Sequence, residues 1–408
     1  MSSKSTPPST TSAGISVIRQ ALYFPLGLAA LYLTFFLGLL TPIFQRHFIF
    51  LHAIQYPFFP AYDQPHKYGL APFKTRNLTF STSDGERIGA WHILPEIFYQ
   101  SHLSINTHDH DQEQEQEQWD EEVYDRAMRE YPTILYLHGN SMNRAAPFRI
   151  AAYSAMTSRM DVNVVAIDYR GFGDSTGVPS EQGLAIDAEA AYGWIRKKQR
   201  SSSQSIAVFG QSLGTGIATL VAEKLEQLGT PLKGVVLMAP YTDLKALVKD
   251  FKLAGLFPVL APIGVIPFNN LILDKFLKTQ LRTITTLPNL IQPSASHETS
   301  IVLLHAKDDP VIPVKHSRVL FETLLKHASH TTQPKVLKRT IAQSATIQRF
   351  NPPSSSSSSS SSFLYQNGEE NKATVTLIET EFGGHDQLTE GALDLVRLAL
   401  KLPSHLSA

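Results

Sequence analysis

The sequence predicts an α/β protein in which a mostly parallel β-sheet is covered by helices on both faces and preceded by one transmembrane helix. Three observations lead to this prediction: an uncharged apolar segment near the N-terminus, a series of short apolar runs from about residue 77 onward, and helical patterns between those runs. Strands that alternate with helices form parallel sheets, and the strands of such sheets are continuously apolar because both of their faces are buried.

The composition of the 408-residue chain excludes several classes of function. The chain is 43% hydrophobic, which is enough for a large core, and its length allows one large or two medium domains. Its 36 basic residues balance 36 acidic residues, so no net positive field favours the binding of nucleic acid. Because the chain has no cysteine, disulfide bonds, thiolate metal sites and a cysteine nucleophile are excluded.

The first predicted element is a transmembrane helix over residues 21–44. No charged residue occurs between Gln20 and Gln45, and about 20 apolar residues are enough to cross a bilayer. A cleaved signal peptide and a buried hairpin are the alternatives, although the apolar core of a signal peptide is usually shorter. The tail of residues 1–20 begins with many serines, threonines and prolines, which predicts disorder.

The orientation of this helix is predicted from the charges that flank it. Lys4 and Arg19 precede the apolar segment and Arg46 follows it, so the bias of positive charge is slight and favours a cytosolic N-terminus. The main domain is then expected on the lumenal side. Asn77 begins a glycosylation sequon, and its use would agree with that orientation.

A juxtamembrane segment of residues 45–76 leads into the main domain, which we assign to residues 77–402. Aromatic residues are frequent at the start of this segment and suit the membrane interface. In the main domain, eight runs are typical of strands and read, in order, NLTFST, IGAWHIL, TILYLHG, NVVAIDY, SIAVFG, GVVLMAP, SIVLLHA and ATVTLIE. Helical patterns cover Ser180–Lys198, Leu213–Leu228, Val314–His327 and Leu388–Leu402.

Three further segments of the main domain do not fit this alternation. Residues 99–130 are acidic and glutamine-rich and residues 328–366 contain nine consecutive serines, so both are predicted to be disordered surface insertions. The first insertion holds metal-ligand side chains at residues 108–111, but a loop without a fixed backbone does not preorganise them, so we expect no bound metal. Residues 243–287 are apolar yet interrupted by prolines, which argues against a second membrane span.

A candidate nucleophile lies in Gly210-Gln211-Ser212-Leu213-Gly214, which matches the pattern G-x-S-x-G. Ser212 directly follows an apolar strand and precedes an uninterrupted helical pattern, which is the context that a nucleophile elbow requires. A second match surrounds Ser175, but Pro179 follows it closely and argues against a continuous helix there. We therefore predict that Ser212 is the nucleophile and that Ser175 is a structural turn residue.

A serine hydroxyl needs a general base, and His385 is the candidate. It follows the last predicted strand, and two glycines before it let the loop approach the site. A carboxylate that orients the imidazole should follow the preceding strand, where Asp308 and Asp309 stand side by side. Pro310 favours an extended backbone at Asp309, which suits a side chain that reaches across a loop, and Asp308 is expected to accept backbone N–H groups of the turn.

Two backbone N–H groups are predicted to stabilise the oxyanion that forms during acyl transfer. One is the N–H of Leu213, at the start of the helix after Ser212, and the other is the N–H of Asn140, in the loop after the strand TILYL. Polar residues at or just after other strand ends are expected to be structural: His138, His305, Asp168 and Arg170.

These motifs resemble those of the alpha/beta-hydrolase superfamily. The chain carries, in this order, HGN, DYRGFGDSTG, PSEQG, GQSLGTG, HAKDDPVIP and GGH. The pattern is most similar to the membrane-anchored monoacylglycerol lipase and lysophosphatidylserine lipase branch, and it covers residues 68–402 apart from the two insertions. The resemblance implies an alpha/beta-hydrolase fold with an eight-stranded, mostly parallel sheet, and an apolar lid at residues 243–287. An extra pair of core helices is the alternative for that segment.

Carried onto this sequence, the resemblance implies a catalytic triad of Ser212, Asp309 and His385, with Asn140 and Leu213 in the oxyanion hole. It implies a serine hydrolase, integral to the endoplasmic reticulum membrane, that cleaves fatty acyl esters of monoacylglycerol or lysophospholipid through an acyl-enzyme. No metal or cofactor and no nucleic acid is expected; the partners are the lipid substrate and the bilayer, and the oligomeric state stays open. A protein depalmitoylase or general carboxylesterase is the alternative, and a non-catalytic membrane scaffold is less favoured.

Overall fold

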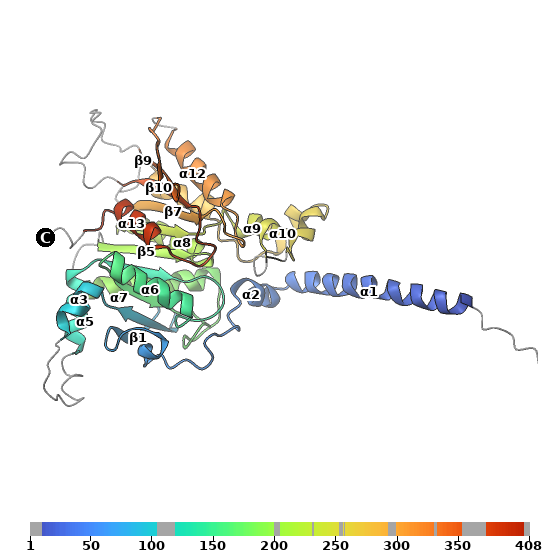
Figure 1. The fold of residues 1–408 in the computed structure, drawn as a ribbon, viewed down its shortest axis with the longest axis horizontal. Coiled ribbons are helices and arrows are strands. Elements are labelled where there is room, and N and C mark those ends of the chain that lie inside the picture. The colour runs from blue at the N-terminus through green and yellow to red at the C-terminus, as the bar shows by residue number, and fades with distance from the viewer. Residues whose placement is uncertain are drawn as a thin grey trace, which may run out of the picture.

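A ten-stranded sheet runs through the main part of the computed structural model, in the order β1-β2-β4-β3-β5-β6-β7-β10-β9-β8 (Figure 1). The six central strands, from β4 to β10, are parallel, and two antiparallel strands flank them on each side. The structure describes residues 10–103, 119–199, 205–230, 232–252, 256, 258–292, 299–329, 333–352 and 373–403. The residues 108–111 considered for a metal and the serine run at 354–362 lie outside these ranges.

The eight strands predicted from the sequence are all present, as β1 to β7 and β10. The strands are β1 (Thr75–Ser81), β2 (Arg87–Ile93), β3 (Thr133–Leu137), β4 (Asn163–Ile167), β5 (Ile206–Gln211), β6 (Gly234–Met238), β7 (Ser300–Ala306), β8 (Leu337–Ile341), β9 (Ala345–Phe350) and β10 (Val375–Thr380). The helices that flank the sheet are α3 (Glu96–His102), α5 (Glu121–Glu130), α6 (Pro147–Arg159), α7 (Glu181–Gln199), α8 (Leu213–Gln227), α12 (Lys315–Ala328) and α13 (Glu390–Ala399).

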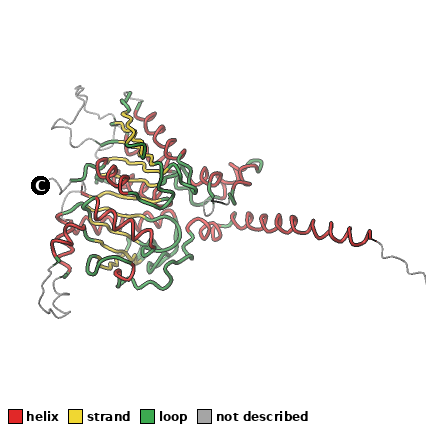
Figure 2. Tube along the Cα trace, viewed as in Figure 1, coloured by secondary structure: helices red, strands yellow, loops and turns green. Residues whose placement is uncertain are grey.

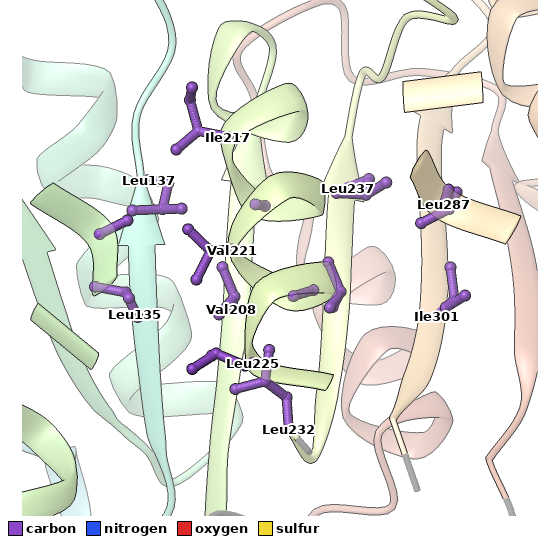
Figure 3. Packing of buried hydrophobic residues seen from close by; sticks show 14 of the residues in the cluster. Leu135, Leu137, Val208, Ile217, Val221, Leu225, Leu232, Leu237, Leu287 and Ile301 are labelled. Carbon is purple, nitrogen blue, oxygen red and sulfur yellow. The ribbon is translucent and has the colours of Figure 1, made fainter. Parts of the chain in front are cut away.

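Two apolar layers form the core, one on each face of the sheet. Successive residues of β3 alternate between them, with Leu135 and Leu137 in one layer and Ile134 and Tyr136 in the other. The first layer packs under α7, α8 and α12, and the second under α6 and α13. Helices therefore cover both faces of the sheet, as Figure 2 shows, and Figure 3 shows the α8 side of the core.

The sheet has ten strands, so the expectation of eight was wrong. The two additional strands, β8 and β9, lie in the segment 328–366 that was predicted to be a disordered insertion. β9 pairs antiparallel with β10, and its Phe350 is buried against Phe321 of α12 with ring centroids 5.4 Å apart. The serine-rich composition nearby concealed the short run ATIQRF, which alternates in polarity only over its first four residues and forms a strand by pairing with the edge of β10.

The described residues of the other insertion, 99–130, are also ordered, contrary to the prediction. α5 and the end of α3 bury Tyr99, Trp119 and Tyr124 in a small separate cluster. Arg76 on β1 anchors α5 through ion pairs with Glu121 and Asp125. The acidic residues Glu121 and Asp125, which suggested disorder in the sequence, are therefore the ion-pair partners of the buried Arg76.

The apolar N-terminal segment folds as two helices, α1 (Thr10–Leu39) and α2 (Pro42–Phe50). Thr41 has an extended backbone, and its side chain accepts the N–H of Phe44 at 3.4 Å. Pro42 at the first position of α2 disfavours a helical residue before it, which explains the break. In the described part of the chain no single helix meets the length and composition needed to cross a membrane. The length and composition are met only by two helical segments taken together, Tyr23–Leu39 and Pro42–Phe50, which are bent by 98° relative to each other.

Candidate active site

The site begins with a strained turn between β5 and α8. Ser212 has φ 50° and ψ −118°, a conformation that raises its side chain out of the end of the strand. The two glycines of the motif are required by close packing: a side chain at Gly210 would overlap the backbone of α8, and one at Gly214 would overlap the carbonyl oxygen of Leu137. The sequence G-x-S-x-G therefore forms the elbow that its pattern predicts.

Ser212, His385 and Asp309 form a continuous hydrogen-bonded chain. Nε2 of His385 lies 3.0 Å from Oγ of Ser212, and Nδ1 of His385 lies 2.9 Å from Oδ2 of Asp309. The three residues follow β5, β10 and β7, which are parallel strands of one sheet, so their C-terminal ends lie at the same edge. With the proton of the neutral ring on Nδ1, facing the carboxylate, Nε2 is free to accept the proton of the serine hydroxyl.

The electrostatics of the pair favour an ionised aspartate and a basic histidine. Burial by itself raises the pKa of Asp309, but hydrogen bonds from His305 and His385 and from the N–H of Ile312 outweigh it, and the pKa lies well below its usual range. Burial lowers the pKa of His385, and the hydrogen bond and charge of Asp309 outweigh this, so that the pKa of His385 is raised.

The two neighbouring aspartates have different contacts, and one expectation about them was wrong. Asp309, not Asp308, accepts the backbone N–H groups of the turn, from Val311 at 2.8 Å and Ile312 at 2.9 Å. Oδ1 of Asp308 instead accepts the N–H of Gly384 at 2.8 Å, which ties the loop after β7 to the loop that carries the histidine. A carboxylate with two lone pairs on each oxygen can hold a turn and a histidine together, which sequence reasoning did not consider.

The loop after β3 lies directly against the serine. Gly139 packs so close that a Cβ there would be 3.3 Å from Cβ of Ser212. Asn140 and Leu213 both line the cavity around Ser212, and neither backbone N–H donates to an acceptor among the described residues. Two uncommitted donors beside the Ser212 hydroxyl suit an oxyanion, which is the role that the sequence predicts for them.

A buried arginine that sequence reasoning missed holds this loop. The guanidinium of Arg149, on α6, donates to the carbonyls of Asn143 at 2.8 Å, Ser141 at 2.9 Å, Gly139 at 3.3 Å and Asn140 at 3.4 Å. Arg149 is fully buried, and these four partners of its guanidinium are backbone carbonyls rather than carboxylates. The signal in the sequence that could have indicated the contact between Arg149 and this loop is the position of an arginine on the apolar, buried face of α6.

The residues predicted to be structural have structural contacts. Oγ of Ser175 donates to the carbonyl of Asp168 at 2.6 Å and accepts the N–H of Gly89 at 2.9 Å. His138 is buried beside Tyr169, and burial lowers its pKa well below the usual value. Buried polar residues complete the set: His305 hydrogen-bonds Ser317, Asp168 pairs with Arg144, and Arg170 pairs with Asp84 and Asp187.

A mostly apolar cavity of about 310 Å³ opens onto the serine. Segment 243–287 forms part of its wall through α9 (Leu244–Asp250), η3 (Ala261–Val265) and α10 (Asn269–Phe276). Other parts of the wall come from the loop after β3, from the end of α1 and from α2. A cavity of this size and polarity suits an apolar ligand with one reactive polar group.

Comparison with known proteins identifies the fold family and several relatives of the chain. Residues 132–261 match the family model described as alpha/beta hydrolase fold. Lysophosphatidylserine lipase ABHD12 of Xenopus tropicalis is 31% identical over 307 residues, which cover 75% of this chain and 72% of that protein. The Bos taurus protein of the same name is 31% identical over 74% of this chain and 69% of its own, and Protein ABHD12B of Homo sapiens is 31% identical over 61% of each.

The fold and the family model define the class of the protein, an alpha/beta hydrolase. Within that class, the identity and coverage of the relatives show that the chain belongs to the ABHD12 family.

Proposed function

We propose that this protein is a membrane-associated serine hydrolase that cleaves the fatty acyl ester of a lysophospholipid or monoacylglycerol. The observation that carries the proposal is the chain from Asp309 through His385 to Ser212, which ends in an apolar cavity. The names of the ABHD12 relatives support a lysophospholipid as the substrate class.

The geometry supports a two-step reaction. Nε2 of His385 takes the proton of Ser212 as Oγ attacks the ester carbonyl, and the N–H groups of Asn140 and Leu213 hold the oxyanion. Collapse of this intermediate expels the alcohol, which receives the proton from His385. Water, deprotonated by the same ring, then attacks the acyl-enzyme and releases the fatty acid. Asp309 keeps the ring oriented and stabilises its charged form.

Labelling and turnover of the full-length protein in detergent micelles test this function. A fluorophosphonate probe should label the wild type and the Ser175→Ala variant but not Ser212→Ala. The wild type should release fatty acid from lysophosphatidylserine or monoacylglycerol faster than from an acylated peptide or a short soluble ester. Preference for the acylated peptide would indicate a depalmitoylase, preference for the short ester a carboxylesterase, and absence of both labelling and turnover a scaffold.

The apolar N-terminal helix pair supports membrane association, because the side chains of Tyr23–Leu37 are largely exposed. We place the main domain on the lumenal side of the endoplasmic reticulum, with its sequon at the exposed Asn77 on β1. Protease protection in sealed microsomes measures this orientation: a protected main domain is expected, and digestion without detergent would refute it.

A further inference from the structure

Gln45, at the start of α2, connects the N-terminal helices to segment 243–287. Its Nε2 donates to the carbonyl of Leu39 and to the carbonyl of Phe276, each at 2.7 Å, and its Oε1 accepts the N–H of Lys278 at 3.1 Å. Leu39 is the last residue of α1 and Phe276 the last residue of α10, so one amide satisfies the terminal carbonyls of two helices. Gln45 is only 5% exposed.

The two elements that this amide joins both line the cavity that opens at Ser212. From the N-terminal helices the lining includes Phe36, Leu39 and Phe48, and from segment 243–287 it includes Leu273 and Phe276. In Figure 1, α9 and α10 extend from the domain on the same side as α1. Residues of the apolar N-terminal helices therefore form part of the wall of the cavity that opens at Ser212.

The end of α2 also contacts the loop beside the serine. The carbonyl of Phe50 accepts the N–H of Ser141 at 2.9 Å, and the carbonyl of Ile54 accepts the N–H of Met142 at 2.7 Å. These bonds hold two residues with positive φ, 61° at Ser141 and 57° at Met142. The N-terminal helices thus bond both to the loop beside Ser212 and, through Gln45, to the part of the wall that segment 243–287 supplies.

We propose that the N-terminal helix pair is part of the acyl-chain site, that the wall between α1 and α10 is the part of the cavity farther from Ser212, and that Gln45 is a positioning residue that holds this wall in contact with long acyl chains. The proposal rests on the proposed ester hydrolysis and adds the part of the site that selects chain length. A short acyl group needs only the end of the cavity near Ser212, whereas a long chain also needs the wall between α1 and α10. Loss of the three bonds of Gln45 separates that wall and leaves the reactive end in place.

The variant Gln45→Leu places an apolar side chain of similar size at this position and removes the three bonds. The measurement is kcat/KM of full-length protein in detergent micelles for p-nitrophenyl palmitate and p-nitrophenyl butyrate, with active sites counted by fluorophosphonate. Each methylene that loses its contact lowers kcat/KM about fourfold, so loss of two contacts lowers the palmitate value about fifteenfold. The butyrate value is expected to change less than about twofold.

Gln199→Leu is the matched control. Gln199 is also buried, and both ends of its amide form hydrogen bonds: it donates to Thr133 and accepts from Ser205, each at 2.9 Å. Thr133, however, is the first residue of β3 and lies at the end of that strand opposite the site. If Gln45→Leu does not fold, Gln45→Glu, which keeps the acceptor for Lys278 and loses both donated bonds, takes its place. An equal fall for both esters, an unchanged ratio, or the same ratio in the control variant overturns the proposal.

Ligand binding separates this proposal from the proposed function. Affinity for a pyrene-labelled fatty acid, measured by fluorescence in the Ser212→Ala background, needs no turnover. We expect Gln45→Leu to weaken this binding about fifteenfold, and an unchanged affinity refutes the role of Gln45 even if the protein hydrolyses no ester. Failure of the wild type to hydrolyse esters or to react with fluorophosphonate, with weakened binding retained, refutes the proposed function alone.

Discussion

Replacement of Asp309 by asparagine tests the triad most directly. The amide keeps an acceptor for the turn N–H groups of Val311 and Ile312, so the fold should survive. Its NH₂ group, however, faces Nδ1 of His385 at the present 2.9 Å contact and favours the tautomer with the proton on Nε2, which can no longer accept from Ser212. By comparison with other triads the loss in turnover is on the order of 10⁴, or roughly 5 kcal/mol of transition-state stabilisation.

The pH dependence of the same variant supplies an independent measurement. The charge of Asp309 raises the pKa of His385, and only the neutral ring acts as a base, so kcat/KM of the wild type falls as the pH drops through this raised pKa. Removing the carboxylate lowers the pKa of His385. The acid limb of the residual activity should therefore move to lower pH in Asp309→Asn.

The assay is hydrolysis of a short soluble ester by Asp309→Asn and Asp308→Asn, at matched folded fraction from thermal unfolding. Asp308→Asn keeps an acceptor for the N–H of Gly384 and should lose less than about tenfold, since at most one hydrogen bond of about 1 kcal/mol is weakened. An inactive Asp308 variant beside an active Asp309 variant would refute the assignment. An acid limb that does not move in Asp309→Asn would refute the electrostatic reasoning.

Four further changes follow from the site geometry. Ser212→Ala should abolish turnover and leave the unfolding temperature unchanged. Ser175→Ala should keep turnover but lose about 1–3 kcal/mol of stability, because the carbonyl of Asp168 and the N–H of Gly89 lose their partner. The reverse pattern would show that Ser175 is the nucleophile. Gly214→Ala should destabilise by about 1–3 kcal/mol in denaturant unfolding because its Cβ overlaps the carbonyl of Leu137, and a neutral result would contradict the packing. Arg149→Met should lower kcat/KM for a short ester about 100-fold by releasing the loop that carries the oxyanion donor, and full activity in that variant would rule out a positioning role.

The structure also shows where local sequence signals fail. Residues 345–348 alternate in polarity, but Arg349 breaks the alternation, and so short a run beside a serine tract has no preference strong enough to predict a strand. β9 exists because the edge of β10 supplies its hydrogen bonds and because Phe350 packs against α12. The break between α1 and α2 did have a local signal, since Pro42 disfavours a helical residue at Thr41.

The sequence by itself determined the central strands, the elbow around Ser212 and the candidate base His385. These depend on local properties: continuous apolar runs indicate buried strands, and glycines at fixed spacing permit a tight turn. Only the tertiary structure decided that Asp309 both binds the turn and reaches His385, and that Gln45 contacts Phe276, 231 residues away in sequence. Such contacts depend on how separate elements are placed in space, and side-chain hydrogen bonds between distant segments leave no periodic trace in the chain that carries them.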